Sequence, residues 1–311
     1  MRATLVLVSF FALGASFRSS WSRTVVGGVR RRAAARPGVD MIAGKLRYLH
    51  LYASDPGKMV AFYDQVFGLT VQRTGEGSPS ASFVAAGSEM NGEHFSLKII
   101  DFPAADADVS RHVSLVLFAK SLDDVVSAVP GLGGEVVAEP EAITLGPSLV
   151  PDEEMETKIE LRRAIVRDPS GYSIEVIEGE RTDPVGRVVL PVTDLDRAID
   201  FYTGSMGMTM HRKRSLVPLE PAMCAYLSFA DSEDASTLLE LRYNYATKRI
   251  STGSVAQHLT ISTPDVPAVV DSLVADAPVS ARGESDATVG DPEGYGLELM
   301  DELELLKQTL G

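Results

Sequence analysis

The side chains best suited to chemistry in this sequence are glutamates and histidines inside apolar, strand-like runs. Two similar stretches, DPSGYSIEVIE (168–178) and DPEGYGLELMD (291–301), each hold a glutamate between aliphatic residues. Two other runs, RHVSLVLF (111–118) and QHLTIST (257–263), each hold a histidine, and TLLELRYN (237–244) holds a further glutamate. Burial of a polar group without a partner is costly, so these positions need a partner or a cavity. They are His112, Glu175, Glu240, His258 and Glu298.

Strand alternation places these five side chains opposite the large aliphatic residues. Successive side chains of a strand point to opposite faces, so Glu298 points away from the face that holds Leu297 and Leu299. The pattern predicts sheets with one apolar face and one polar, concave face. Histidines and glutamates around one cavity suit a hard or borderline divalent metal, with water in the empty positions.

A structural interpretation competes with the metal site for each residue. A single histidine in a strand is commonly a hydrogen-bonded structural residue, and a single glutamate in a closing strand commonly faces solvent. The repetition favours the metal site, because both copies place His and then Glu at the same two points. A duplication can also preserve residues that have no function.

The chain contains one unit written twice. YASDPGKMVAFYDQVFGLTVQR (52–73) aligns with PVTDLDRAIDFYTGSMGMTMHR (191–212), and a short polar link, GERTDPVG (179–186), joins the copies. The first copy is longer by 16 residues between these stretches and the closing ones. The extra length falls in the Pro- and Glu-rich run 138–160, which we predict to be a loop or flap.

Each copy reads as a strand, a helix and several strands, followed by the same pattern again. An apolar strand precedes Asp55 or Asp194, an amphipathic helix follows, and Gly68 or Gly207 is placed to end it. A second strand, a second helix and a closing hairpin complete the copy. The final ELELLKQTL (302–310) reads as a short helix that packs on the body. The pattern predicts an α+β fold with two half-modules per copy.

Residues 1–40 have the composition of a targeting leader. An early Arg2 precedes the apolar run LVLVSFFALGA, which is too short to span a bilayer, and residues 1–39 contain seven Arg and no acidic residue. A signal-like core followed by a basic, acid-free segment is typical of the two-part leader of a complex plastid. A mitochondrial presequence is the first alternative and secretion the second.

Without this leader the chain is strongly acidic. It keeps 22 basic and 43 acidic residues, a net charge of −21. Such a body repels phosphate backbones, which argues against nucleic acid as a partner. No later run is long enough to cross a membrane. The single cysteine, Cys224, excludes intramolecular disulfides and multi-cysteine metal sites.

Both copies resemble the vicinal-oxygen-chelate superfamily, and within it a two-domain, plant-type glyoxalase I. The resemblance is carried by VTDLDRAIDFYTGSMGMTMHRK, TLLELRYNY, AQHLTI and DPEGYGLELMDE, and runs from about Lys45 to the C-terminus. It implies an α+β fold of two tandem vicinal-oxygen-chelate domains, in which paired βαβββ modules form a curved sheet around a cavity. The domains would be residues 41–180 and 184–303, after the leader 1–40 and before a tail 304–311.

The resemblance also implies four metal-ligand places in each copy. In the second copy three places match, and the fourth falls on Arg187, whose guanidinium stays protonated. In the first copy two places match, and the others fall on Tyr48 and Lys98. His50 lies on the same strand face as Tyr48 and is an alternative ligand there. The matching residues are Glu240, His258 and Glu298 in the second copy, and His112 and Glu175 in the first.

In glyoxalase I, one copy gives the first two ligands of a cavity and the other copy gives the last two. On that pattern, one cavity here would contain Arg187, Glu240, His112 and Glu175. The other would contain Tyr48, Lys98, His258 and Glu298. Copies that close on themselves would instead combine Arg187 and Glu240 with His258 and Glu298. Either pairing leaves three of four ligands in one cavity and two in the other.

The activity implied by the resemblance is isomerisation of the hemithioacetal of methylglyoxal and glutathione, a small-molecule substrate. A divalent metal, Ni or Zn with Co or Mn as alternatives, would act as Lewis acid. Glu175 or Glu298 would move the proton, first as base and then as acid. Asn244 matches a position that contacts glutathione, and its structural alternative is a turn. A monomer with two pseudo-symmetric domains is implied.

Two other functions stay open. A non-catalytic or metal-free small-molecule-binding member is favoured by Arg187, which would put a positive charge beside any metal. A ring-cleaving dioxygenase needs a His, His, Glu triad, which Arg187 leaves incomplete in the second copy.

Overall fold

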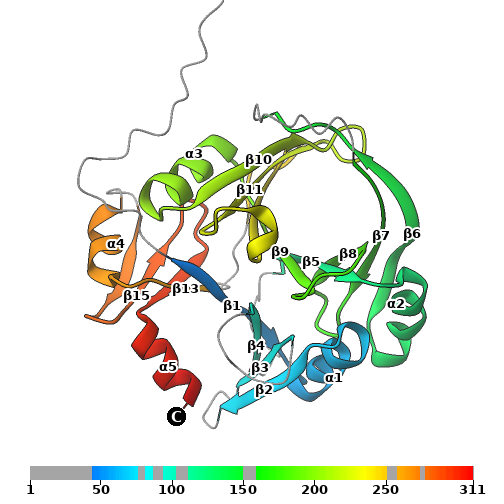
Figure 1. Cartoon of the computed structure of the whole chain (residues 1–311), viewed down its shortest axis with the longest axis horizontal. Coiled ribbons are helices and arrows are strands. Elements are labelled where there is room, and N and C mark those ends of the chain that lie inside the picture. Colours follow the sequence, from blue (N-terminus) through cyan, green and yellow to red (C-terminus); the bar gives the residue numbers. More distant parts are fainter. Residues whose placement is uncertain are drawn as a thin grey trace, which may run out of the picture. The chain divides into compact units, whose positions relative to one another are not determined.

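Four βαβββ modules make up the part of the chain that the structure, a computed structural model, describes (Figure 1). The described residues are 44–75, 81–86, 94–102, 111–149, 159–250, 258–273 and 277–310. The leader expected in residues 1–40 lies outside them. The predicted α+β fold of βαβββ modules is confirmed.

The first copy of the repeat contributes two modules. The first module consists of β1 (Lys45–Ala53), α1 (Pro56–Phe67), β2 (Thr70–Gly75), β3 (Ala81–Ala85) and β4 (Ser96–Asp101). The second consists of β5 (Ser114–Ala119), α2 (Leu122–Ala128), the 3-10 turn η1 (Pro130–Leu132), β6 (Glu135–Leu145), β7 (Ile159–Arg167) and β8 (Ser173–Glu178).

The second copy repeats this order. Its first module consists of β9 (Val185–Pro191), α3 (Leu195–Asp200), the π-helical η2 (Phe201–Ser205), β10 (Thr209–Ser215), β11 (Ala222–Ser228), the 3-10 turn η3 (Glu233–Ala235) and β12 (Leu238–Asn244). Its second consists of β13 (His258–Ser262), α4 (Val266–Ser272), β14 (Val279–Arg282), β15 (Asp286–Gly290) and β16 (Gly296–Met300), and α5 (Glu302–Leu310) follows.

The corresponding helices of the two copies begin and end at the residues that the repeat indicates. The Asp55 carboxylate accepts a hydrogen bond from the Lys58 amide at 3.0 Å, and Asp194 accepts one from Arg197 at 3.0 Å. Both therefore satisfy an amide of the first helical turn that has no partner within the helix. Gly68 ends α1 with φ of 68°, as predicted, a left-handed conformation that glycine adopts without strain.

Each of the two sheets combines one module from each copy. Sheet I has the strand order β14-β15-β16-β13-β1-β4-β3-β2, and sheet II has the order β10-β11-β12-β9-β5-β8-β7-β6. The copies meet where β1 runs antiparallel to β13 and where β5 runs antiparallel to β9. Of the two pairings that the sequence left open, the structure therefore adopts the one across copies.

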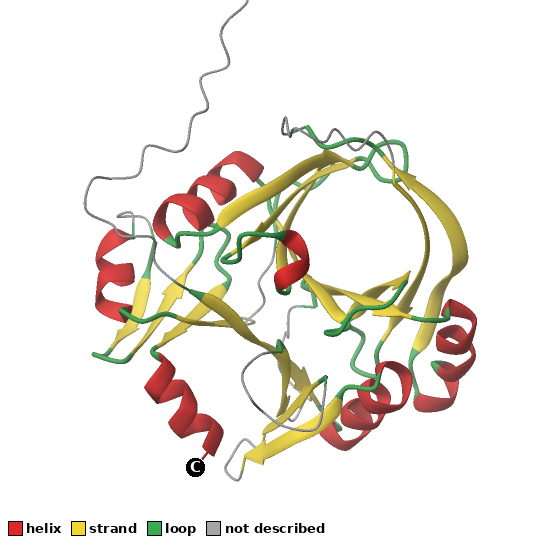
Figure 2. Ribbon diagram, in the orientation of Figure 1, coloured by secondary structure: helices red, strands yellow, loops and turns green. Residues whose placement is uncertain are grey.

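Both sheets have an apolar face in the core and a face that carries polar side chains, and Figure 2 shows their curvature. Leu297 and Leu299 of β16 are fully buried in the main apolar cluster, whereas Glu298 between them is not part of it. The same alternation holds in β8 and β12. We call the second surface the polar face; it carries Glu175, Glu240 and Glu298, as the alternation predicted.

Two buried tyrosine–aspartate hydrogen bonds link the sheets, and they explain the repeated sequence motifs. The Tyr63 hydroxyl, on α1, donates to Asp168 at 2.9 Å, just before β8 of the other sheet. In the second copy, Tyr202 of η2 donates to Asp291 at 2.9 Å, just before β16. The other oxygen of each aspartate accepts two backbone amides of its own Asp-Pro-x-Gly-Tyr turn. The Phe-Tyr and Asp-Pro motifs thus hold the two modules of one copy together across different sheets.

The Pro- and Glu-rich run 138–160 was predicted to be a loop, and this prediction is wrong for its first part. Residues up to Leu145 belong to β6, which pairs antiparallel with β7. Pro140 lies within a register shift between Ala138 and Glu141, where a residue without an amide hydrogen is tolerated. Residues 150–158 lie outside the described ranges.

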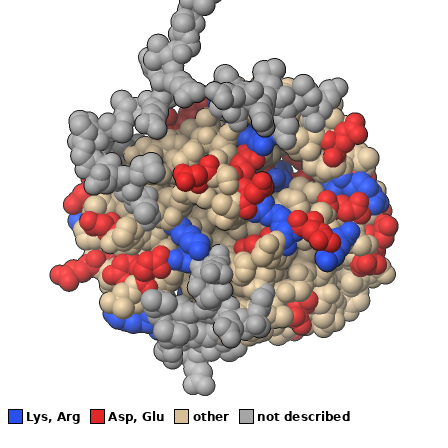
Figure 3. Space-filling view, viewed as in Figure 1, with Lys and Arg blue, Asp and Glu red and all other residues tan. Residues whose placement is uncertain are grey.

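The C-terminal helix α5 packs against sheet I, as predicted. Leu305 is buried with Tyr48, Phe83 and Met300. Glu302 accepts hydrogen bonds from Arg47 at 2.5 Å and from Ser262 at 3.0 Å. Within the described ranges, no helix has the length and hydropathy needed to cross a bilayer. On the face shown in Figure 3, acidic and basic side chains are interspersed.

Burial gives the linking aspartates a testable pH dependence. Desolvation raises the pKa of Asp168 and of Asp291 to about 6, although the hydrogen bonds they accept oppose it. Between pH 4 and 6 the folded state therefore binds more protons than the unfolded state, and its free energy of unfolding falls as pH rises. We expect wild type to lose about 2 kcal/mol per aspartate between pH 4.5 and 7, relative to Asp168→Asn/Asp291→Asn.

Urea denaturation at the two pH values measures this difference. The exposed Asp123→Asn serves as the control, with an unchanged pH dependence. A constant difference between wild type and the double variant would contradict the assigned pKa shift.

Candidate functional site

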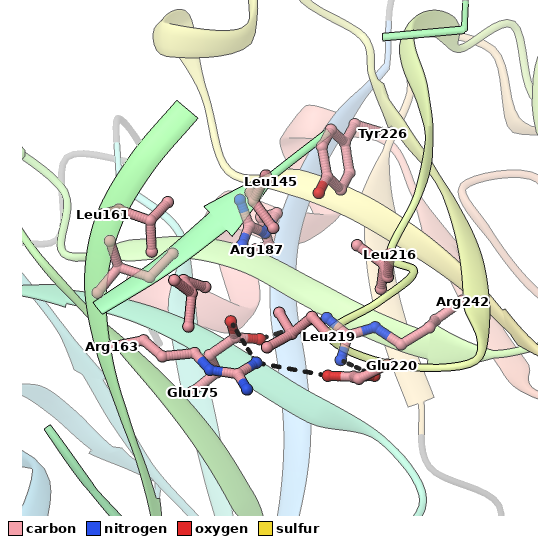
Figure 4. Close-up of a pocket in the computed structure, with 12 residues that line it drawn as sticks. Leu145, Leu161, Arg163, Glu175, Arg187, Leu216, Leu219, Glu220, Tyr226 and Arg242 are labelled. Atoms are coloured by element: carbon pink, nitrogen blue, oxygen red, sulfur yellow. Dashed lines mark hydrogen bonds and ion pairs between the residues drawn. The ribbon is translucent and has the colours of Figure 1, made fainter. Parts of the chain in front are cut away.

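The polar face of sheet II holds a network of arginines and glutamates (Figure 4). At its centre is Glu240, whose side chain is completely buried. Arg187 Nε lies 2.9 Å from its Oε2, and Arg242 Nη2 lies 2.6 Å from its Oε1. The contact with Arg187 is close but not aligned as a hydrogen bond. Arg187 also stacks on the Tyr226 ring, 5.1 Å from its centroid.

Glu175 is held by the same network. Arg242 Nη2 lies 3.3 Å and Arg163 Nη1 lies 3.5 Å from its two carboxylate oxygens. Burial alone would raise the pKa of Glu175, but the charges of Arg242, Arg187 and Arg163 outweigh it and lower the pKa. Glu175 is therefore ionised at neutral pH.

Two members of this network were missed by the sequence reasoning. Arg163 is buried on β7, and strand alternation indicates it, since its neighbours Ala164 and Val166 belong to the apolar core. Glu220 reaches the network from the connection between β10 and β11, where it pairs with Arg163 at 3.4 Å. Nothing in the sequence around Glu220 indicates this contact.

His112 does not line the pocket of sheet II. It is exposed and precedes β5. The parallel pairing of β5 with β8 aligns Leu115 with Ile174, whereas β13 with β16 aligns His258 with Gly296. By this register, Ser114 and not His112 takes the place that His258 has in sheet I. The distance along the chain to the next helix agrees: Asp265 caps α4 seven residues after His258, and Ser121 caps α2 seven residues after Ser114.

The side chains on sheet II do not fit a divalent cation. Three guanidinium groups, which stay protonated at any relevant pH, surround the two carboxylates that would be ligands. Each carboxylate is already within 3.5 Å of two arginines. A metal ion bound to either carboxylate would therefore lie beside two positive charges.

The polar face of sheet I holds a chain of hydrogen bonds through His50, Thr260 and Glu298. The Thr260 hydroxyl donates to Glu298 Oε2 at 2.7 Å, and His50 Nε2 lies 3.0 Å from the same hydroxyl oxygen. Because Thr260 gives its only proton to Glu298, His50 Nε2 is the donor to Thr260. His50 Nε2 also lies 3.4 Å from Glu298 Oε2.

His258 lies beside this chain. Its ring centroid is 5.5 Å from that of His50. The ring covers Gly296 on the neighbouring strand so closely that a methyl group at Gly296 would overlap it. In sheet II, Ser173 stands at the matching position of β8. A glycine at 296 therefore makes room for the imidazole.

Tyr48 and Lys98 occupy the other two expected ligand places on sheet I. Tyr48 packs edge-on against Phe83 with ring centroids 5.1 Å apart. The Lys98 ammonium lies 5.6 Å from the centroid of the same Phe83 ring, a cation–π distance. His50, which is two residues after Tyr48 on β1 and pairs with Lys98 of β4, was the alternative ligand suggested by the sequence, and the structure brings it to Glu298.

Burial and hydrogen bonding set the protonation states of His50, His258 and Glu298 on sheet I. Burial lowers the pKa of His50 to about 4, with a partial opposing effect of Glu298. Burial also lowers the pKa of His258. For Glu298, burial would raise the pKa, but the hydrogen bond and charge of His50, the Thr260 hydroxyl and Lys98 together lower it to about 2. At neutral pH the set is two neutral imidazoles and one carboxylate.

This donor set has the chemistry that a divalent metal requires, since ligand histidines must be neutral and carboxylates ionised. The two imidazoles and one carboxylate leave positions open for water or substrate. Within the described ranges, no three His, Cys, Asp or Glu side chains already converge as a metal cage. Metal binding on sheet I would therefore require His50 and Glu298 to exchange their mutual contact for contacts with the ion.

The model of the Glyoxalase/Bleomycin resistance protein/Dioxygenase superfamily matches residues 45–176 and 185–299. The chain belongs to this superfamily. Its two matched segments correspond to the two copies of the repeat, whereas its sheets mix modules from both.

Several members of the superfamily resemble the chain over most of its length. A lactoylglutathione lyase of Arabidopsis thaliana is 29% identical over 284 residues, which cover 84% of this chain and 94% of that protein. Another A. thaliana protein, named "Probable lactoylglutathione lyase, chloroplastic", is 27% identical and covers 85% of this chain and 75% of its own length. The crystal structure of glyoxalase I from Zea mays shares the fold, with TM-score 0.71, 23% identity and coverage of 86% of this chain and 95% of that one.

Asn244, the predicted glutathione contact, lies at the end of β12 on sheet II. Its side-chain oxygen accepts a hydrogen bond from the Ala246 amide at 3.0 Å. It therefore serves in a turn, and its contact with glutathione stays a prediction.

Charge compensation around Glu240 predicts a large effect of Arg187 on stability. Arg187→Ala leaves the buried carboxylate with one guanidinium instead of two, and we expect a loss of about 3 kcal/mol in the free energy of unfolding. Arg187→Leu/Glu240→Leu should recover most of this loss, because neither charge then remains.

Urea denaturation of the three proteins and of the control Arg162→Ala tests this. Arg162 forms a more exposed pair with Glu178 at 2.8 Å, and its loss should cost less than about 1 kcal/mol. Equal losses for Arg187→Ala and Arg162→Ala would contradict the role of Arg187.

Proposed function

We propose that the chain is a glyoxalase-I-like lyase that isomerises the hemithioacetal of methylglyoxal and glutathione at the polar face of sheet I. The observation that carries the proposal is the similarity to a lactoylglutathione lyase over 94% of that protein's length. The two-copy architecture, shared with glyoxalase I of Zea mays, supports a working unit of one chain, so we infer a monomer.

The proposal assigns metal binding to His50, His258 and Glu298. A bound divalent ion, Ni or Zn with Co or Mn as alternatives, would supply Lewis-acid polarisation of the substrate oxygens. The predicted alternative ligands Glu175 and Glu240 lie on sheet II among arginines, and His112 is exposed. For these three residues the metal role is therefore less well supported than for the sheet I set.

The proposal also assigns proton transfer to Glu298. Glu298 is ionised at neutral pH, so it can accept the carbon-bound proton of the substrate. Thr260 donates to one of its oxygens and orients the carboxylate. The positive charge of Lys98, on the neighbouring part of the sheet, favours negative charge that develops on the substrate. Glu175, the other predicted base, is engaged by Arg163 and Arg242.

A metal and activity assay tests this assignment. Purified protein loaded with Ni or Zn should bind about one ion per chain and convert methylglyoxal with glutathione. We expect His258→Ala and Glu298→Gln each to lower kcat/KM about 100-fold or more and to reduce bound metal, since even residues behind the ligands affect metal sites 10- to 100-fold. The control Glu175→Gln should keep both properties.

Two other outcomes of this assay would change the assignment. Activity that is lost in Glu175→Gln and kept in Glu298→Gln would move the active site to sheet II. Protein without bound metal and without metal-restored activity would instead be a non-catalytic, metal-free binding member.

A ring-cleaving dioxygenase is the second candidate. Its His, His, Glu triad lacked one histidine because Arg187 stands at that ligand place, and His50 on sheet I can supply it. Two histidines and one carboxylate are the ligand set of non-haem Fe(II) oxygenases. Oxygen uptake by the Fe(II)-loaded protein with catechol, lost in His50→Ala, would favour this function over the lyase.

We further infer import into a plastid. The basic, acid-free residues 1–39 and the chloroplastic name of one relative support it. A fluorescent protein fused to residues 1–40 should accumulate in the plastid of an alga with complex plastids. Accumulation in mitochondria or in the medium would contradict this inference.

A further inference from the structure

The pocket on the polar face of sheet II has no role in the proposed reaction, yet it is lined by an ordered set of charges. Arg163, Arg187 and Arg242 face Glu175 and Glu220 across it (Figure 4). Its enclosed space is about 10 Å³, room for about one water molecule. Side chains therefore fill the pocket in this conformation.

Glu220 fills the pocket from a connecting segment and not from the sheet. It belongs to residues 216–221 between β10 and β11. Arg163 Nη1 lies 3.4 Å from its Oε1, and Arg242 Nη1 lies 3.6 Å from its Oε2. Two guanidinium groups thus hold the two oxygens of one carboxylate.

The fit of Glu220 between these arginines is loose. Direct bonds between guanidinium and carboxylate groups are usually 2.7–2.9 Å long, and both contacts of Glu220 are longer. Its side chain is 28% exposed, whereas that of Glu240 is fully buried. A free carboxylate, not tethered to residues 216–221, can approach both arginines more closely.

The two arginines stay in place without Glu220. Arg163 also pairs with Glu141 at 3.0 Å and with Glu175. Arg242 also pairs with Glu240 at 2.6 Å. Without Glu220, the three guanidinium groups keep Glu141, Glu175 and Glu240 as partners, so their charges stay compensated. The Nη1 groups of Arg163 and Arg242 lose the oxygens of Glu220, and a ligand carboxylate can supply two oxygens in their place.

The rest of the pocket lining is largely apolar. Leu216 and Leu219 come from the same connection as Glu220, and Leu145 and Leu161 come from β6 and β7. A ligand that replaces Glu220 therefore meets aliphatic side chains next to its carboxylate. We propose that this pocket binds an aliphatic monocarboxylate, whose carboxylate takes the place of Glu220 between Arg163 and Arg242 while the partly exposed Glu220 side chain turns outward.

Isothermal titration of the purified protein with hexanoate tests the proposal. Glu220→Gln removes the competing charge and keeps the side-chain shape, so we expect it to bind hexanoate at least 10-fold more tightly than wild type. Hexan-1-ol, with the same chain and no charge, should not bind. Arg163→Gln in the Glu220→Gln background should abolish binding, whereas Arg162→Gln, on the same strand, should keep it.

Three results would overturn the proposal. The first is no saturable binding of hexanoate to Glu220→Gln, and the second is equal binding of hexanoate and hexan-1-ol. The third is binding of glutathione in place of hexanoate, which would indicate a polar ligand. If Arg163→Gln does not fold, the comparisons of Glu220→Gln with wild type and of acid with alcohol decide. None of these titrations uses metal or methylglyoxal, so their outcome is independent of the proposed lyase activity.

Discussion

Charges buried on a sheet face must be compensated, and the two sheets of this protein do so in different ways. On sheet II, guanidinium groups compensate Glu175 and Glu240 at distances of 2.6–3.5 Å. On sheet I, the hydrogen bond from Thr260 and the nearby side chains of His50 and Lys98 stabilise Glu298. The first arrangement repels a cation, whereas the second leaves a carboxylate and two neutral imidazoles available to one. From this difference we infer that a metal would bind on sheet I and not on sheet II.

Pairing across copies makes this division possible. Each polar face takes one module from each copy, so Arg187 in the second copy affects sheet II and leaves sheet I unchanged. The buried Tyr63–Asp168 and Tyr202–Asp291 bonds keep the modules of each copy together across the sheets. One duplicated unit therefore builds two chemically distinct faces.

Much of the fold could be predicted from the sequence, because it depends on local patterns. Strand alternation placed Glu175, Glu240 and Glu298 on the polar faces, and capping residues marked the helix starts. The pairing across copies was only one of two options, since strand partners far apart in sequence leave no local signal.

His112 was aligned with His258 by residue type, whereas strand register assigns that place to Ser114. Pro140 favoured a loop where the structure has β6, because a register shift in the strand accommodates the proline. Glu220 lies in a connecting segment whose approach to Arg163 depends on tertiary packing alone.

In the proposed assignment a metal binds on sheet I and not on sheet II. Anomalous diffraction from crystals grown with zinc measures this directly. We expect one peak, about 2.0–2.2 Å from an imidazole nitrogen of His50, one of His258 and a carboxylate oxygen of Glu298. A peak between Glu175 and Glu240, or no peak at saturating zinc, would contradict it.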